Sequence, residues 1–304
     1  MRISIIGTGA IGGYYGMLLA EMGHDLHFLL NSDYDYVKAN GLKLHSQIHE
    51  DIYLSTVNAY KDTSDMPVSD VVLVCLKTNQ NGGVLPKVIP HVADENTVVI
   101  LIQNGLGMEE ELSKYFPELQ IGGATALIGS RKEKNGIIIH ESYGNIDFGS
   151  YSVKNVSVLD RLVADFNTIN VPSSRKDLLY LRWKKLVWNM TFNGLSVLLG
   201  TTTDQIINRH ILLCKTIMYE VIRAANACGV EIPISFADEL ILFTAKMDCY
   251  SPSMKVDFDR AQPLELEYMY NRPIITADIA GYEMTEIKNL YNELCKIQNL
   301  QNRN

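Results

Sequence analysis

The stretch IIGTGAIGG, residues 5–13, decides the fold of this chain. Gly7, Gly9 and Gly12 form a GxGxxG pattern between a strand-like run and an amphipathic helix-like segment. In this pattern the first glycine allows a tight turn, the second lets the backbone approach a pyrophosphate, and the third lets the helix pack closely on the strand. The phosphates then lie at the helix N-terminus. We therefore predict a dinucleotide site formed by Gly7, Gly9, Ala10, Ile11 and Gly12.

The rest of the first half alternates short runs of Val, Ile and Leu with segments of helical periodicity, which is typical of a parallel sheet covered by helices. The predicted strands are ISII, DLHFLL, VVLVCL and TVVILI, at residues 3–6, 25–30, 71–76 and 97–102. Residues 136–151 alternate apolar and polar side chains around a Gly-Asn pair, which predicts an antiparallel hairpin that turns there.

From Asp177 onward the pattern is almost entirely helical, after a turn-rich link, NVPSSRKD. A chain of 304 residues also exceeds what one hydrophobic core usually organises. We therefore expect an α/β dinucleotide-binding domain at residues 1–174 and an all-helical substrate or catalytic domain at residues 175–304.

Composition excludes several classes of protein. The formal net charge of -8 argues against a nucleic-acid partner. No apolar run approaches the roughly 20 residues that span a bilayer, and the first strand begins too early for a cleavable signal, so no membrane partner is expected. The five cysteines are odd in number and form no CxxC pair, which favours reduced thiols. A cytoplasmic enzyme without a metal is the simplest interpretation.

Polar residues follow the second predicted strand, where a dinucleotide enzyme distinguishes its cofactors. An acid at this point selects the free ribose of NAD, and a basic residue selects the 2′-phosphate of NADP. Asn31 and Ser32 could donate hydrogen bonds to such a phosphate, whereas Asp33 lies a little beyond the usual position of the discriminating acid.

Two later strand ends also carry polar residues, and ligands of open α/β sheets gather at the carboxyl ends of strands. Lys77 and Gln80 follow the run at 71–76, and Asn104 follows the run at 97–102. These side chains are candidates to contact the cofactor. Because Asn-Gly is a favoured turn dipeptide, a plain turn role for Asn104 stays open.

The segment WKKLVWNMTFN, residues 183–193, predicts a helix buried on most sides, since its apolar residues surround the axis. Lys185, Asn189 and Asn193 are spaced four residues apart and therefore share one stripe of that helix. Lys184 points about 100° away and is expected to face solvent. Buried amides and ammonium groups are costly without partners, so either the protein or a bound molecule must satisfy this stripe.

The motifs GTGAIGG, LKTNQ, QNG, WKKLVWNMTFN, SPSM and PLELE occur in this order over nearly the whole chain. In this combination the sequence resembles the ketopantoate reductase (2-dehydropantoate 2-reductase) family. The resemblance implies a Rossmann-type N-terminal domain and a helical C-terminal domain that closes over the cleft. It also implies NADPH-dependent reduction of a 2-keto acid, 2-dehydropantoate, to pantoate, which is a step in pantothenate and coenzyme A biosynthesis.

The resemblance also implies roles for individual residues. Lys185 would be the catalytic acid, which suits a reaction that leaves an alkoxide when hydride reaches the keto carbon. Glu265 would bind a substrate hydroxyl. The remaining side chains would hold the substrate or line the nicotinamide side of the cleft. The first group is Asn189, Asn193, Ser253 and Asn104, and the second group is Lys77 and, again, Asn104.

Three departures from the family pattern affect specific expectations. Asn31 stands where the family commonly has Arg, so we expect only a modest preference for NADPH, with NADH the less favoured cofactor. No third asparagine follows Asn193 in LLGTTTDQI, which leaves the exact 2-oxo acid open. Asn271 stands near the position of a common glycine, and we expect it to adopt the left-handed conformation.

Other patterns in the chain suggest different classes of protein. Tyr180 and Lys184 fit the YxxxK pair of short-chain dehydrogenases, but that family spaces its glycines as GxxxGxG. His45 and His49 have no matching metal-ligand constellation. A reductase of another branched 2-oxo or 3-hydroxy acid remains open, as does a non-catalytic dinucleotide sensor, which would need neither the helix lysine nor the later glutamate. Either a monomer or a homodimer is compatible with the sequence.

Overall fold

The computed structural model describes residues 1–247 and 249–301, which divide into two compact units. The first unit comprises Met1–Gln103 and Met108–Leu178, and the second comprises Asn104–Gly107 together with the chain from Leu179 onward. Each unit has its own hydrophobic core. The predicted fold class, an α/β sheet domain followed by a helical one, is confirmed.

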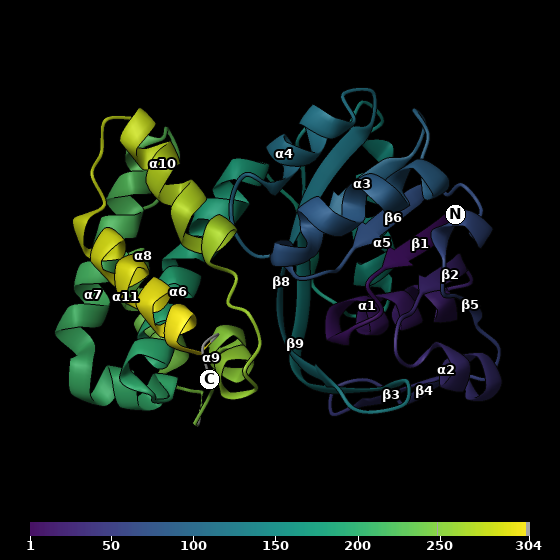
Figure 1. Cartoon of the computed structure of the whole chain (residues 1–304), viewed down its shortest axis with the longest axis horizontal. Helices are drawn as coiled ribbons and strands as arrows, with labels where there is room; N and C mark the ends of the chain where they lie inside the picture. Colours follow the sequence, from purple (N-terminus) through teal and green to yellow (C-terminus); the bar gives the residue numbers. More distant parts are fainter. Residues whose placement is uncertain (248, 302–304) are drawn as a thin grey trace. The chain divides into compact units, whose positions relative to one another are not determined.

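The first unit is built on a ten-stranded sheet in the order β4-β3-β9-β8-β7-β6-β1-β2-β5, with β10 paired to β9 (Figure 1). Its strands are β1 (Arg2–Ile6), β2 (Asp25–Leu29), β3 (Leu42–Ser46), β4 (Ile52–Leu54), β5 (Asn58–Tyr60), β6 (Val71–Val74), β7 (Val98–Leu101), β8 (Gln120–Lys132), β9 (Ile137–Ser150) and β10 (Ser173–Arg175).

The central strands β5, β2, β1, β6, β7 and β8 run parallel, which is the Rossmann-type arrangement. Strands β6 and β7 are buried along their whole length, as continuous Val, Ile and Leu runs predict. The chain leaves β1 toward β2 on one side and returns with β6 on the other side. The carboxyl end of β1 is therefore the point where strand order reverses, and the glycine loop begins there.

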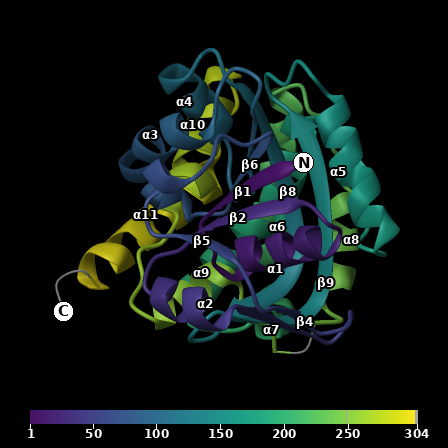
Figure 2. The same cartoon turned by 90° about the vertical axis from the view of Figure 1, so that its right-hand side faces the viewer.

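Helices cover both faces of this sheet. Helices α1 and α5 share one face, where the rings of Tyr15 and Phe166 lie 5.5 Å apart between centroids, and α3 and α4 cover the opposite face (Figure 2). The helices of this unit are α1 (Ala10–Glu21), α2 (Tyr34–Asn40), α3 (Asn81–Val92), α4 (Met108–Tyr115), α5 (Ser157–Thr168) and the short 3₁₀ segments η1 (Thr63–Asp65) and η2 (Thr78–Gln80).

The predicted hairpin within residues 136–151 is wrong, because these residues form one strand, β9, that pairs antiparallel with β8. The hairpin turns instead at residues 134–136, where Asn135 and Gly136 have positive φ angles of 61° and 70°. The Gly144-Asn145 pair lies at a bulge, where Leu127 pairs with Asn145 and Ile128 pairs with Tyr143. Two Asn/Gly pairs occupy this region, and only long-range pairing distinguishes a turn from a bulge.

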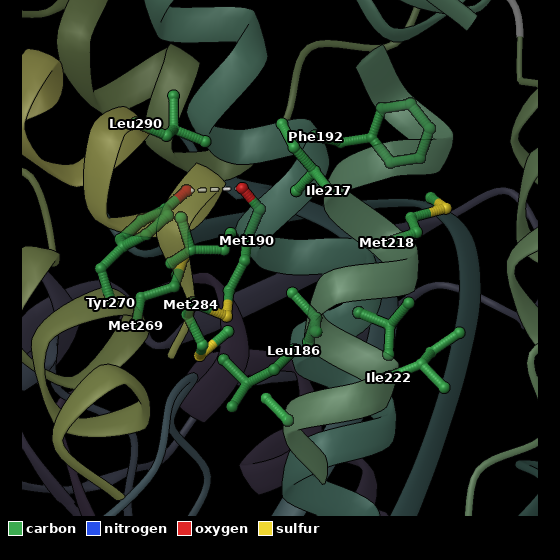
Figure 3. Close-up of a cluster of buried hydrophobic side chains, with 14 of the residues drawn as sticks. Leu186, Met190, Phe192, Ile217, Met218, Ile222, Met269, Tyr270, Met284 and Leu290 are labelled. Atoms are coloured by element: carbon green, nitrogen blue, oxygen red, sulfur yellow. Dashed lines mark hydrogen bonds between the residues drawn. The ribbon is translucent and has the colours of Figure 1, made fainter. Parts of the chain in front are cut away.

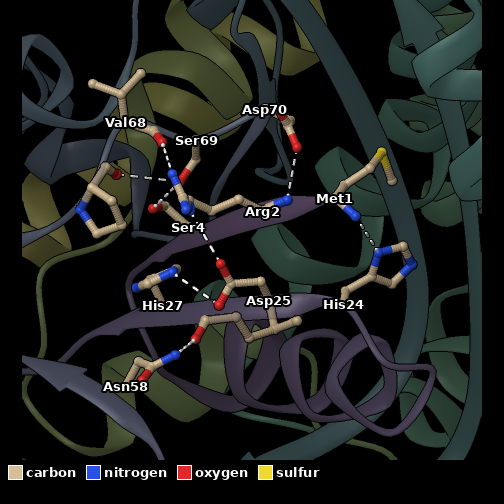
Figure 4. Close-up of polar contacts among 12 residues, drawn as sticks. Met1, Arg2, Ser4, His24, Asp25, His27, Asn58, Val68, Ser69 and Asp70 are labelled. Atoms are coloured by element: carbon tan, nitrogen blue, oxygen red, sulfur yellow. Dashed lines mark hydrogen bonds and ion pairs between the residues drawn. The ribbon is translucent and has the colours of Figure 1, made fainter.

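Polar contacts tie the amino-terminal end of β1 to its neighbours (Figure 4). The Arg2 backbone N–H donates to Asp70 at 2.8 Å, and its guanidinium donates to Asp25 at 3.1 Å. The Ser4 and Ser69 hydroxyls lie 2.8 Å apart within the buried sheet. These contacts fix the amino-terminal end of β1 against the strands on both sides. They thereby help to fix the position of the glycine loop, which follows the carboxyl end of the same strand.

The second unit is helical, with α6 (Leu178–Leu199), α7 (Thr203–Ala227), α8 (Phe236–Thr244), α9 (Ser253–Asp259), the π-helix η3 (Glu267–Asn271), α10 (Arg272–Ile279) and α11 (Thr285–Gln301). Helix α6 is buried on most sides, as predicted, and contributes Leu186, Met190 and Phe192 to the core (Figure 3). The Tyr270 hydroxyl donates to the Met190 carbonyl at 2.8 Å within that core. Among the described residues, no helix is long and apolar enough to cross a membrane.

The predicted left-handed conformation of Asn271 is wrong. Its φ of −61° and ψ of −48° are right-handed helical, and it is the last residue of the π-helix η3. Its side chain donates to Glu267 at 2.8 Å, one turn earlier. Because the chain passes directly from η3 into α10, this position needs no residue with positive φ.

Candidate active site

The glycine loop has the backbone geometry that its sequence predicts. Gly7 has a φ of +98°, a conformation that side chains rarely adopt, and a Cβ there would lie 2.8 Å from Leu76 Cδ2. A Cβ at Gly12 would collide with the Gly7 carbonyl oxygen and lie 2.8 Å from Ile5 Cγ2. The first and third glycines are therefore required by the turn and by the close packing of α1 on β1.

Gly9 meets a different environment, because a Cβ built there has no atom of the described residues within 4 Å beyond its own chain neighbours and helix backbone. Gly9 is the N-cap of α1, no side chain caps this helix end, and its first turn contains no acidic residue. Ala10 and Ile11 in that turn are half-buried. An uncapped helix N-terminus beside open space suits a phosphate group, so the glycine loop fits the pyrophosphate of a dinucleotide.

The end of β2 lies against the glycine loop. The Thr8 hydroxyl donates to the Leu29 carbonyl at 2.8 Å. Beyond β2, Asn31 and Ser32 are exposed, whereas the Asp33 side chain is 10% exposed and its Oδ2 lies 2.6 Å from Lys132 Nζ. Sequence reasoning missed Lys132, because it is distant in the chain and no local motif marks it.

The ends of β6 and β7 are joined by a pair of amides. Asn81 Nδ2 donates to Gln103 Oε1 at 3.0 Å, and Gln103 Nε2 donates back to Asn81 Oδ1 at 2.7 Å. Gln103 also donates to the Leu76 carbonyl at 2.8 Å. Lys77, the N-cap of η2, and Gln80, its last residue, are both exposed beside this pair. The amide pair fixes the backbone that presents these two candidates.

The segment Asn104–Gly107 belongs to the second unit. The Leu106 N–H donates to the Tyr268 carbonyl of η3 at 2.9 Å, and Gly105, with a φ of +119°, leaves no room for a Cβ beside that carbonyl. The Asn-Gly turn is therefore structurally required. It also holds the half-buried Asn104 against the helical segment that follows Glu265.

Lys185, Asn189 and Asn193 lie on α6, and their surroundings differ. Lys185 is half-buried, whereas Asn189 and Asn193 are 4% and 1% exposed. The Asn189 Nδ2 atom is buried and has no hydrogen-bond partner among the residues that the structure describes. Buried donors are rarely left unpaired, so Asn189 is the position on this stripe that most needs a bound acceptor.

Asn193 is already used by the fold. Its Oδ1 accepts a hydrogen bond from the Met254 backbone N–H at 2.9 Å and lies 3.5 Å from the Ser253 hydroxyl. This contact anchors the first turn of α9 to α6. Ser253 itself is exposed at the start of α9. The structure thus brings these two predicted residues together, with the Asn193 oxygen in a structural contact.

The pKa of Lys185 is lowered from 10.5 to about 8, because burial disfavours the charged ammonium and the Arg182 guanidinium repels it. The Glu265 carboxylate acts in the opposite direction and raises the pKa of Lys185. Arg182 and Glu265 are 2% and 6% exposed, so the charges that act on Lys185 are themselves buried. An ammonium with a pKa of about 8 can both hold and release a proton during a reaction.

Arg182 was not singled out from the sequence. The signal that could have found it is a guanidinium one turn before Lys185 in a helix whose other residues are mostly apolar. Lys184 was expected to face solvent, and it does so only in part. It is half-buried, and its ammonium lies 5.5 Å from the Tyr180 ring centroid and 5.0 Å from that of Phe236.

Comparison with known proteins identifies the family. Residues 3–152 match the model of ketopantoate reductase PanE/ApbA, and residues 177–298 match the model of its C-terminal part. A 2-dehydropantoate 2-reductase of Nostoc sp. is 41% identical over 301 residues, which cover 96% of this chain and 94% of the relative.

Solved structures share the fold. The 2-dehydropantoate 2-reductase from Geobacter metallireducens GS-15 superposes with a TM-score of 0.92 at 35% identity, over 97% of this chain and 99% of the other. A D-mandelate dehydrogenase, solved with NADH and anilino(oxo)acetate, has the same fold at 18% identity, with a TM-score of 0.85 and 99% of each chain covered. The chain therefore belongs to the ketopantoate reductase family of oxidoreductases.

Proposed function

We propose that this protein reduces 2-dehydropantoate to pantoate, with NADPH as the hydride donor and Lys185 as the acid. The observation that carries the proposal is the stripe on α6, where an ammonium with a pKa of about 8 lies on the same side of the helix as the unpaired donor of Asn189. The name of the Nostoc relative, 41% identical over almost the whole chain, supports this substrate.

The chain's own residues supply the proton of this reaction. When bound, the dinucleotide supplies a hydride to the keto carbon of the substrate. The carbonyl oxygen then gains a negative charge, which the Lys185 ammonium stabilises and protonates as it forms. Glu265 accepts a hydrogen bond from a substrate hydroxyl and keeps Lys185 charged. Asn189 donates its free N–H to the substrate, which orients the keto group.

The first unit would hold the cofactor. Gly7, Gly9, Ala10, Ile11 and Gly12 surround the pyrophosphate, supported by the open space at Gly9 and the uncapped end of α1. Asn31 and Ser32 face the adenosine side. Lys77 and Gln80 contact the nicotinamide half, which suits their positions after β6. Asn104, from the segment that belongs to the second unit, is a further candidate to contact it.

NADPH is the proposed donor, with a modest preference over NADH. Asn31 and Ser32 are neutral hydrogen-bond donors, which bind a 2′-phosphate less strongly than the bidentate guanidinium of an arginine. The variant Asn31→Arg should therefore increase the preference for NADPH.

A second substrate remains a candidate, namely another branched 2-oxo acid. The Asn193 oxygen is engaged with α9, so this asparagine has less hydrogen-bonding capacity to offer a substrate hydroxyl. The D-mandelate dehydrogenase with the same fold was solved with a different 2-oxo compound, anilino(oxo)acetate. This suits a fold that can bind 2-oxo compounds whose own substituents differ.

The test is oxidation of NADPH and of NADH by the purified protein, followed by the loss of nicotinamide absorbance. The panel contains 2-dehydropantoate and 2-oxo acids that lack its hydroxyl group. We expect kcat/KM to be highest for 2-dehydropantoate with NADPH. If a hydroxyl-free 2-oxo acid reacts at least as efficiently, the second candidate is the substrate class, and if no 2-oxo acid reacts, the reductase proposal is wrong.

A further inference from the structure

A lysine from a distant strand lies at the end of β2. Lys132 is the last residue of β8, and its Nζ donates to the Thr8 carbonyl of the glycine loop at 2.6 Å. The same ammonium lies 2.6 Å from Asp33 Oδ2. Lys132 therefore joins the loop expected to hold the pyrophosphate to the segment expected to contact the adenosine ribose.

The contact matters for cofactor choice because Asp33 is an acid near the end of the second strand. A free carboxylate near the end of the second strand favours NAD, because it accepts hydrogen bonds from the ribose hydroxyls and repels a 2′-phosphate. The Asp33 side chain is only 10% exposed and is paired with Lys132. The pair leaves this acid without the net negative charge that would exclude NADP.

The segment after β2 offers no cation of its own. Residues 30–36 read LNSDYDY and contain neither Lys nor Arg. Lys132 brings a positive charge to this segment from another strand. We propose that Lys132 is the specificity-determining residue for the cofactor, because it neutralises Asp33 and presents an ammonium N–H to a 2′-phosphate. This inference rests on the proposed dinucleotide-dependent function and goes beyond it.

The geometry leaves Lys132 able to reach a phosphate. Its side chain is 25% exposed. The Thr8 carbonyl oxygen and Asp33 Oδ2 each lie 2.6 Å from Lys132 Nζ. An ammonium has three N–H donors, so two partners leave one N–H for an incoming phosphate.

The experiment measures binding of two nucleotide fragments, which does not depend on the substrate. Isothermal titration calorimetry with 2′,5′-ADP and with 5′-AMP gives the affinity contributed by the 2′-phosphate. For Lys132→Met, we expect 2′,5′-ADP affinity to fall by about 10- to 100-fold, while 5′-AMP affinity changes by less than about twofold. For Asp33→Asn, 2′,5′-ADP affinity should rise by about threefold or more, since the lysine loses its competing carboxylate.

Lys134→Met is the matched control. Lys134 is an exposed lysine two residues further along, so its replacement makes the same change in net charge. We expect it to leave the ratio of the two affinities unchanged. The thermal unfolding midpoint of each variant shows whether the fold is retained, and the double variant Lys132→Met/Asp33→Asn should bind 2′,5′-ADP more tightly than Lys132→Met alone.

Two results would overturn the inference while leaving the proposed function intact. If Lys132→Met weakens the binding of both fragments equally, Lys132 only stabilises the glycine loop. If it changes neither affinity, Lys132 does not contribute to cofactor binding. If the natural protein binds neither fragment and does not bind NADPH, the dinucleotide assignment itself is wrong and the inference is overturned with it.

Discussion

The pKa of Lys185 predicts how catalysis depends on pH. A general acid works only in its protonated form, so its contribution is fully present below its pKa and is lost as pH rises through that value. With a pKa of about 8, kcat/KM for the keto acid should fall above pH 8 by about tenfold for each further pH unit. A lysine at its ordinary pKa of 10.5 would leave the rate nearly constant over the same range.

Burial and two charged neighbours set how far the pKa of Lys185 is lowered. Lowering the pKa from 10.5 to about 8 makes protonation less favourable by about 3 kcal/mol, at about 1.4 kcal/mol for each pH unit. Burial is the largest cause, followed by repulsion from Arg182, whereas Glu265 opposes both. Arg182→Met should therefore move the alkaline limb to higher pH, and Glu265→Gln should move it to lower pH.

The assay is the initial rate of NADPH oxidation with limiting 2-dehydropantoate, from about pH 6 to about pH 10 at constant ionic strength. NADPH affinity and circular dichroism in the same buffers exclude effects on the cofactor or the fold. Lys184→Gln is the control, because its ammonium contacts aromatic rings and should not alter the limb. Two results would refute a role for Lys185 as the titrating acid. One is a rate that stays constant beyond pH 9, and the other is that neither Arg182→Met nor Glu265→Gln shifts the pH at which the rate falls.

Three substitutions test other parts of the site. Gly9→Val fills the open space at the end of α1 and should abolish NADPH binding in fluorescence titrations of the folded variant, whereas normal binding would contradict the pyrophosphate assignment. Asn189→Leu removes a donor without a protein partner, so KM should rise by about tenfold with little loss of stability in urea unfolding. Asn193→Leu leaves the Met254 N–H unpaired and should cost about 1–3 kcal/mol of unfolding free energy; equal stabilities of the two leucine variants would contradict this distinction.

Local sequence patterns predicted the parts of the fold that depend on local geometry. The predicted strands at 3–6, 25–30, 71–76 and 97–102 correspond to β1, β2, β6 and β7. The glycine spacing of the first loop matches a positive φ and a close approach that only glycine permits. Helical periodicity likewise predicted α6 as a helix buried on most sides.

Features set by distant partners could not be predicted in this way. An Asn-Gly pair and a Gly-Asn pair look alike in sequence, and only the pairing of β8 with β9 makes one a turn and the other a bulge. Lys132 reaches Thr8 across 124 positions of the chain. The position of Lys184 depends on the Phe236 ring, which the later helix α8 supplies.

The same limit applies to the stripe on α6. Periodicity places Asn189 and Asn193 on one side of the helix but does not say which amide the protein itself uses. That depends on α9, whose first turn engages Asn193 and leaves the Asn189 nitrogen unpaired among the described residues.

The most direct test of the account is the turnover of Lys185→Ala with NADPH and 2-dehydropantoate at saturation. We predict that kcat falls by about 10²- to 10⁴-fold, the usual scale for losing a positioned acid, while NADPH affinity stays within about twofold of the natural protein. A folded Lys185→Ala enzyme that retains near-normal turnover would show that this lysine is structural and that the acid lies elsewhere.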